Sequence, residues 1–277
     1  PPAGFGARGT VMDNPWIMAL AAVFLWWLST GIILMRVRAA DNAGADQHVW
    51  SCILSLPLLL AGLAGASATA QDASPAGAFL GFLSAMAIWG WIELAFLSGL
   101  ITGPNRAPCP PRVSAGERFR RGVGTLAWHE LALVAALAAL ALLTQGGSND
   151  VGFWTFAVLF LARVSAKLNL FFGVPRIHTE FLPRTLSHLP SHFRRGGISW
   201  FFPLSITVLS LAAWGLLDRL WQATTPGHET GLVLLLALTL LALLEHWFMV
   251  VPLPDQKLWR WMMAAPKPMT PDPAAKD

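Results

Sequence analysis

The sequence predicts an all-α, polytopic membrane protein with seven transmembrane helices, a periplasmic N-terminus and a cytoplasmic C-terminus. Of its 277 residues, 55% are hydrophobic and only 12% are charged, whereas about a quarter of a soluble domain is charged. The chain has fourteen Trp and no Tyr, and Trp is enriched where membrane meets water. Apolar stretches of about 20 residues, the length that crosses a bilayer, recur along the chain.

Each expected helix is bounded by capping or helix-breaking residues. Asp13 and Asn14 can cap the first helix, with Pro15 at its first helical position. The second contains Pro57, and Pro203 falls in the first turn of the sixth, where proline is tolerated. The expected helices cover residues 16–37, 49–66, 76–101, 119–144, 152–173, 200–221 and 230–251.

These helices divide the chain into three parts. Residues 1–15 are expected to form an N-terminal, periplasmic extension, residues 16–252 the seven-helix transmembrane domain, and residues 253–277 a cytoplasmic, Pro-rich tail. Residues 1–11 have neither the basic nor the apolar region of a signal peptide, and Met12 resembles a natural start.

Lysine and arginine predict the orientation. The loops after the first, third and fifth helices, together with the tail, hold fifteen of these residues, whereas the opposite side holds only Arg8 and Arg219. Basic loops stay in the cytoplasm, so this asymmetry places the C-terminus inside. It also explains the net charge of +4 without a nucleic-acid partner, and leaves the lipid bilayer as the expected surrounding.

The expected helices also carry ionisable residues at membrane depth. A rise of 1.5 Å per residue places them about 9–15 Å from the cytoplasmic ends of the third, fourth, fifth and seventh helices. Arg163 and Lys167 are four residues apart and project from one helical face. A charge inside a membrane is costly, so such residues usually meet a partner. The candidate buried charge network consists of Glu93, Glu130, Arg163, Lys167, Asn169 and Glu245.

Three interpretations of this layer remain open. It could be a neutralising network, in which a carboxylate oxygen of Glu93, Glu130 or Glu245 reaches Arg163 or Lys167. It could hold a metal, although His129-Glu130 and Glu245-His246 are adjacent pairs that diverge by about 100° on a helix, unlike the Glu-x-x-His spacing of di-iron bundles. It could also ligate a tetrapyrrole such as bacteriochlorophyll through His129 or His246, which both neighbour aromatic residues.

A second group of possible pigment or metal ligands lies in the loop after the fifth helix: His178, Glu180, His188 and His192. The His-x-x-x-His spacing would place two imidazoles on one face of a helix. Pro190 between them disfavours a regular helix.

Three common catalytic motifs are missing from the sequence, which favours a protein that is not an enzyme without deciding the question. Phosphate-binding, serine-nucleophile and zinc-peptidase motifs are absent from the sequence, as are internal repeats typical of secondary transporters. Cys52 and Cys109 are too few and too far apart for a zinc or disulfide framework.

Several segments resemble the photosynthetic complex assembly protein family called PuhE. They are TGPNRAPCPP (102–111), RFRRGVGTLAWHELAL (118–133), WTFAVLFLARVSAKLNLFFGVP (154–175), EFLPRTLSHLPSHF (180–193) and WFFPLSIT (200–207). The resemblance covers about residues 12–255. It implies a multi-pass protein of the bacterial inner membrane, encoded near the reaction-centre H subunit. Its implied role is to aid assembly of the reaction centre and light-harvesting complex or to modulate bacteriochlorophyll supply, and those subunits and that pigment are its implied partners.

The resemblance supplies no catalytic residues. Two alternatives therefore stay open: a membrane metalloenzyme or oxidoreductase of pigment metabolism that uses the buried Glu/His layer, and a proton-coupled transporter.

Overall fold

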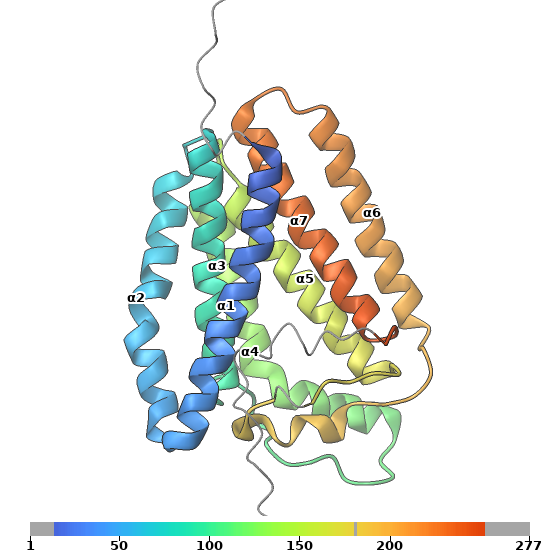
Figure 1. Cartoon of the computed structure of the whole chain (residues 1–277). Coiled ribbons are helices and arrows are strands. Elements are labelled where there is room, and N and C mark those ends of the chain that lie inside the picture. Colours follow the sequence, from blue (N-terminus) through green and yellow to red (C-terminus); the bar gives the residue numbers. More distant parts are fainter. Residues whose placement is uncertain (1–13, 180–181, 253–277) are drawn as a thin grey trace, which may run out of the picture.

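A computed structural model describes residues 14–179 and 182–252, and this part of the chain is all-α (Figure 1). The helices are α1 (Pro15–Ala43), α2 (Asp46–Thr69), α3 (Pro75–Leu97), α4 (Ala115–Leu143), α5 (Val151–Phe172), α6 (Phe201–Trp221) and α7 (Pro226–Phe248), with short 3-10 helices η2 (Arg184–Leu186) and η3 (Leu189–His192) between α5 and α6. Within these described ranges, seven helices are long and apolar enough to cross a membrane, which confirms the expected number of candidate spans.

Local sequence signals explain most helix ends. The side chain of Asn14 accepts hydrogen bonds from the amides of Trp16 and Ile17, as expected of an N-cap. α1 continues to Ala43 rather than ending at residue 37, so it projects beyond an apolar span. α3 ends at Leu97 rather than residue 101, because the chain turns at Gly99 with φ of +78°, a conformation that glycine adopts without strain.

α3 is the central helix of the bundle. It is buried along most of its length and contacts α1, α2, α4, α5 and α7 (Figure 1). α6 lies at the periphery, packed mainly on α7. Because a central helix has neighbours on every side, polar residues on α3 can form hydrogen bonds or ion pairs with several other helices.

Small residues let helices approach α3 closely. A Cβ at Gly62 of α2 would lie 2.8 Å from both the Ser84 carbonyl oxygen and Ile88 Cγ1, and one at Gly152 of α5 would lie 3.0 Å from the Gly81 carbonyl oxygen. Helices that pack inside lipid use such small contact residues because apolar side chains alone give little drive to associate.

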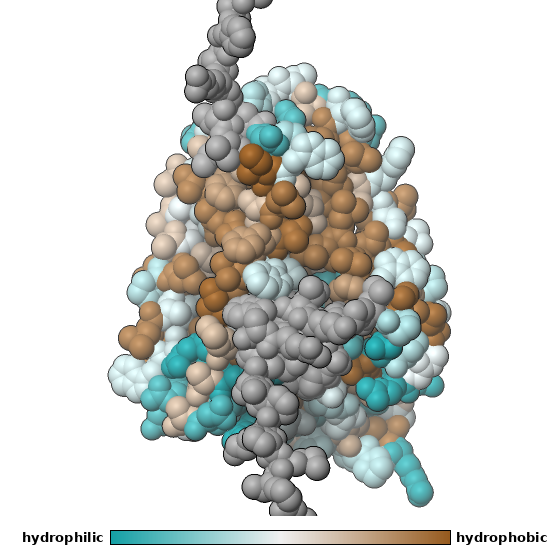
Figure 2. Space-filling model, in the orientation of Figure 1, coloured by the Kyte–Doolittle hydropathy of each residue, from teal (hydrophilic) through white to brown (hydrophobic). Residues whose placement is uncertain are grey.

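The hydropathy of the surface changes along the length of the bundle. Figure 2 shows apolar side chains over the helices and hydrophilic side chains gathered at the lower end, where the α1–α2 turn and the α3–α4 loop lie. The described parts of the segment after α5, residues 173–179 and 182–200, lie at this same end. The segment is anchored there by Arg118 of α4, whose guanidinium donates to the carbonyls of Phe171 and His192 at 3.1 and 3.4 Å. Phe171 lies in the last turn of α5, where carbonyls lack helical partners.

Candidate functional site

The first ion pair of the buried layer joins α3 to α5. Nη2 of Arg163 donates to Oε2 of Glu93 at 2.5 Å. The Glu93 side chain is only 8% exposed, whereas that of Arg163 is 38% exposed. A buried carboxylate needs such a partner, because leaving it unpaired costs several kcal/mol.

A second ion pair joins α4 to α5. Nζ of Lys167 donates to Oε1 of Glu130 at 2.5 Å and lies 3.1 Å from Nδ1 of His129. The two neighbours on α4 therefore both reach one lysine, although they leave the helix in different directions. The long lysine side chain spans that divergence.

The imidazole of His129 lies between the two ion pairs. Its Nδ1 is the ring nitrogen that faces the Lys167 ammonium. Its other ring nitrogen, Nε2, lies 3.4 Å from Oε1 of Glu93. His129 is fully buried and its ring packs on Phe96, with 4.2 Å between ring centroids. It therefore has a ring nitrogen facing a member of each ion pair.

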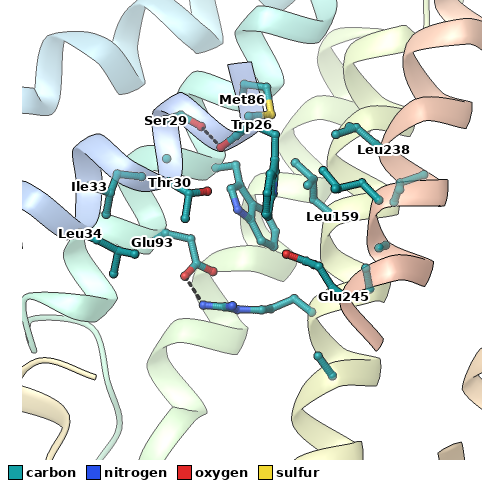
Figure 3. A pocket seen from close by; sticks show the side chains of 18 of the residues that line it. Trp26, Ser29, Thr30, Ile33, Leu34, Met86, Glu93, Leu159, Leu238 and Glu245 are labelled. Carbon is teal, nitrogen blue, oxygen red and sulfur yellow. Dashed lines mark hydrogen bonds and ion pairs between the residues drawn. The ribbon is translucent and has the colours of Figure 1, made fainter. Parts of the chain in front are cut away.

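Glu245 of α7 stands apart from both pairs. It lines a cavity of about 300 Å³ between α1, α3, α5 and α7, together with Glu93 and Arg163. Figure 3 shows its carboxylate directed toward this space, into which Glu93, bonded to Arg163, also faces. Within the described residues, no hydrogen bond or ion pair joins Glu245 to a protein group.

His246 belongs to another polar contact. Its Nε2 lies 2.8 Å from Oγ of Ser165 on α5, and its Nδ1 lies 2.8 Å from the carbonyl oxygen of Ala242. It is 1% exposed. Both ring nitrogens thus have protein partners in this structure, and neither points into an open space where a pigment metal could approach.

Asn169 also lies outside the charge network. Its amide donates to Oγ of Ser205 on α6 at 2.9 Å and to the backbone carbonyl of Ser165 at 3.0 Å. Asn169 is fully buried. It joins α5 to α6 by a neutral hydrogen bond, while Arg163 and Lys167 join α5 to α3 and α4.

The loop histidines separate into two places. His178 lines the cavity, whereas His188 and His192 lie in or beside η3 beneath the bundle. The 3-10 geometry agrees with the expectation that Pro190 would prevent a regular helix. Burial lowers the pKa of His188, with the nearby His192 and Arg106 as smaller causes. Burial is also the main cause that lowers the pKa of His192.

Metal ligation gains no support from the described side chains. In residues 14–179 and 182–252, no group of three or more His, Cys, Asp or Glu is arranged to hold a metal ion. Glu180, the acidic member of the expected loop ligands, lies outside the described residues.

Sequence reasoning missed the serines and the aromatic residues of this region. Ser165 and Ser205 complete the neutral contacts of α5. The sequence gives little indication of this role, because a serine in an apolar helix usually bonds its own backbone. Trp26 of α1 lines the cavity above Glu93 (Figure 3). Nothing in the apolar pattern of the first helix distinguishes it from the other tryptophans.

The assembled layer can do two things. It fixes the rotation of α3, α4 and α5 relative to one another through two charged contacts, since each pair requires a particular face of each helix. It also leaves one carboxylate facing a cavity. Both cations of the layer are already paired with a carboxylate.

Comparisons with known proteins agree on one family. A family model described as "Protein of unknown function (DUF3623)" matches residues 12–270. A protein of Rhodobacter capsulatus named "Uncharacterized 30.4 kDa protein in puhA 5'region" is 56% identical over 263 residues, which cover 95% of this chain and 94% of the relative. No solved structure matches.

Proposed function

We propose that this chain, which belongs to the DUF3623 family, is an integral inner-membrane assembly factor for the bacterial photosynthetic reaction centre and light-harvesting complex. The observation that carries the proposal is the 56% identical relative, whose name places its gene in the puhA 5' region. The resemblance to the PuhE family, which implied a gene near the reaction-centre H subunit, points to the same process.

The seven candidate spans support the membrane location. In the proposed topology the N-terminus is periplasmic and the C-terminus cytoplasmic, with residues 16–252 as the membrane domain between an extension and a tail. The end of the bundle that bears Arg118 and the described parts of the segment after α5 is then cytoplasmic. This face presents the largest structured loops, and we assign to it the contact with newly made reaction-centre or antenna subunits.

Supply of bacteriochlorophyll is the second part of the proposed role. His129 and His246 are enclosed by protein partners in this structure, which disfavours direct ligation by either one. A pigment partner would therefore be bound by another protein of the assembly or against the lipid-facing surface. The same enclosure gives no support to a metalloenzyme or oxidoreductase that uses these histidines.

A clean deletion in a phototrophic host tests the role. It should lower the absorption of assembled reaction centre and antenna in membranes while respiratory growth continues, and the wild-type gene should restore both. Co-purification in mild detergent should retain photosynthetic subunits with the wild-type chain. Normal complex and pigment levels in the deletion strain would overturn the proposal.

A further inference from the structure

The cavity between α1, α3, α5 and α7 has an apolar part and a charged part. Trp26, Met86 and Leu238 line the apolar part, and Glu93 and Glu245 lie at the other end (Figure 3). Arg163 also lines the cavity and is bonded to Glu93 there. Its volume of about 300 Å³ lies at the lower end of the range for small-molecule sites, which combine apolar walls with a few convergent polar groups. This division matches the shape of an amphipathic molecule.

The charges around the cavity do not balance. Among the described side chains of the layer, three carboxylates (Glu93, Glu130 and Glu245) meet two cations, Arg163 and Lys167. Each cation is already in contact with a carboxylate at 2.5 Å. Glu245 is the third carboxyl group, and no cation among the described side chains is left to pair with it.

Hydrogen-bonding capacity at the cavity is also incomplete. Oε1 of Glu93 and Nε of Arg163 are buried without a hydrogen-bond partner, and Glu245 accepts no hydrogen bond from the part of the chain that the structure describes. Two acceptor groups and one donor therefore remain to be satisfied. A ligand that fits this arrangement offers more donors than acceptors and carries positive charge.

We propose that this cavity binds a lipid-soluble primary amine, whose ammonium group pairs with Glu245 and whose apolar chain lies against Trp26, Met86 and Leu238. An ammonium offers three donors, and the carboxylate of Glu245 can accept from it. An alcohol offers one donor, and a carboxylate or phosphate would face two carboxylates. The proposal is independent of the assembly role, because it rests on the charges and shape of the cavity alone.

Three probes of equal chain length test the assignment: dodecylamine, dodecanol and dodecanoate. Their binding to the purified full chain is measured at pH 7.5 by native mass spectrometry, with matched detergent. Dodecylamine should bind at least about tenfold more tightly than either other probe, as expected for a close charge pair in a poorly solvated site. Equal binding of amine and alcohol, tighter binding of the acid, or no binding of any probe would overturn the proposal.

Variants locate the site. Glu245→Gln should remove the preference for the amine, whereas Glu229→Gln, a carboxylate in the first turn of the same helix, should leave it unchanged. Gly90→Leu supplies a second route if the first variant is unstable. A Cβ at Gly90 meets only Ile33 Cδ1, at 3.6 Å, so the side chain can extend into the cavity and should weaken binding of the amine. Unchanged amine binding in both Glu245→Gln and Gly90→Leu would refute the site.

A further arm identifies the source of the amine. The chain is placed in nanodiscs of phosphatidylcholine with or without phosphatidylethanolamine, and dodecylamine binding is measured again. Competition by phosphatidylethanolamine assigns the site to a lipid headgroup, and its absence assigns the site to a free long-chain amine. Both results support an amine site.

Discussion

Replacing Arg163 by methionine tests the role of the α3–α5 ion pair. Methionine keeps an unbranched apolar stem and removes the guanidinium, which leaves the Glu93 carboxylate, 8% exposed, without its cation. Breaking a buried pair in this way costs about 3–5 kcal/mol. We expect the lower end, about 3 kcal/mol, because Nε2 of His129 still lies 3.4 Å from Glu93.

The free energy of unfolding can be measured by circular dichroism in mixed micelles of dodecyl maltoside and sodium dodecyl sulfate. Arg219→Met on α6 is the matched control, since this arginine is exposed, and it should change stability by less than about 0.5 kcal/mol. Adding Glu93→Gln to Arg163→Met should recover about 1 kcal/mol or more, because the orphaned charge is then gone. An Arg163→Met protein as stable as wild type, or a double variant less stable than either single one, would refute the reasoning.

Three further predictions concern packing, polar contacts and pH. Gly103→Ala should destabilise the chain by about 1–3 kcal/mol, because its Cβ would overlap backbone atoms of α4, while Gly116→Ala, which meets nothing, should be neutral in the same unfolding assay. Asn169→Leu should cost about 1 kcal/mol by removing the α5–α6 hydrogen bond, and an unchanged unfolding midpoint would count against that contact. Burial lowers the pKa of His188 and His192 in the folded state, so the unfolded segment binds more protons than the folded one. The folded segment therefore loses stability as pH falls below about 6.5, the ordinary pKa of histidine. Amide hydrogen exchange across residues 184–192 should therefore rise between pH 7.5 and pH 5.5, corrected for intrinsic rates, and stay constant in a His188→Asn/His192→Asn double variant.

The number of helices follows from the sequence because span length and apolar composition are local properties. The capping by Asn14 and the interruption of the loop helix near Pro190 were predictable for the same reason, since each depends on neighbouring residues. The extension of α1 to Ala43 was not, because beyond the apolar span a helix continues or stops according to its contacts.

The charged layer was only partly predictable. Depth along a helix can be counted from the sequence, which groups Glu93, Glu130, Arg163 and Lys167 at one level. Rotation of each helix about its axis depends on packing, so the sequence does not reveal that Glu245 faces a cavity instead of a cation. The cavity itself arises from side-chain sizes on four separate helices.

A distance between Glu93 and Arg163 in a lipid bilayer tests the central claim most directly. Solid-state NMR recoupling between guanidinium ¹⁵N and the carboxyl ¹³C of Glu93, assigned by comparison with Glu93→Gln and Arg163→Met samples, supplies that distance. With Nη2 2.5 Å from Oε2, we expect the labelled atoms within about 4 Å of each other, as in a charge-assisted hydrogen bond. A coupling too weak to detect would mean that the two groups are not in contact, and would contradict the Glu93–Arg163 ion pair.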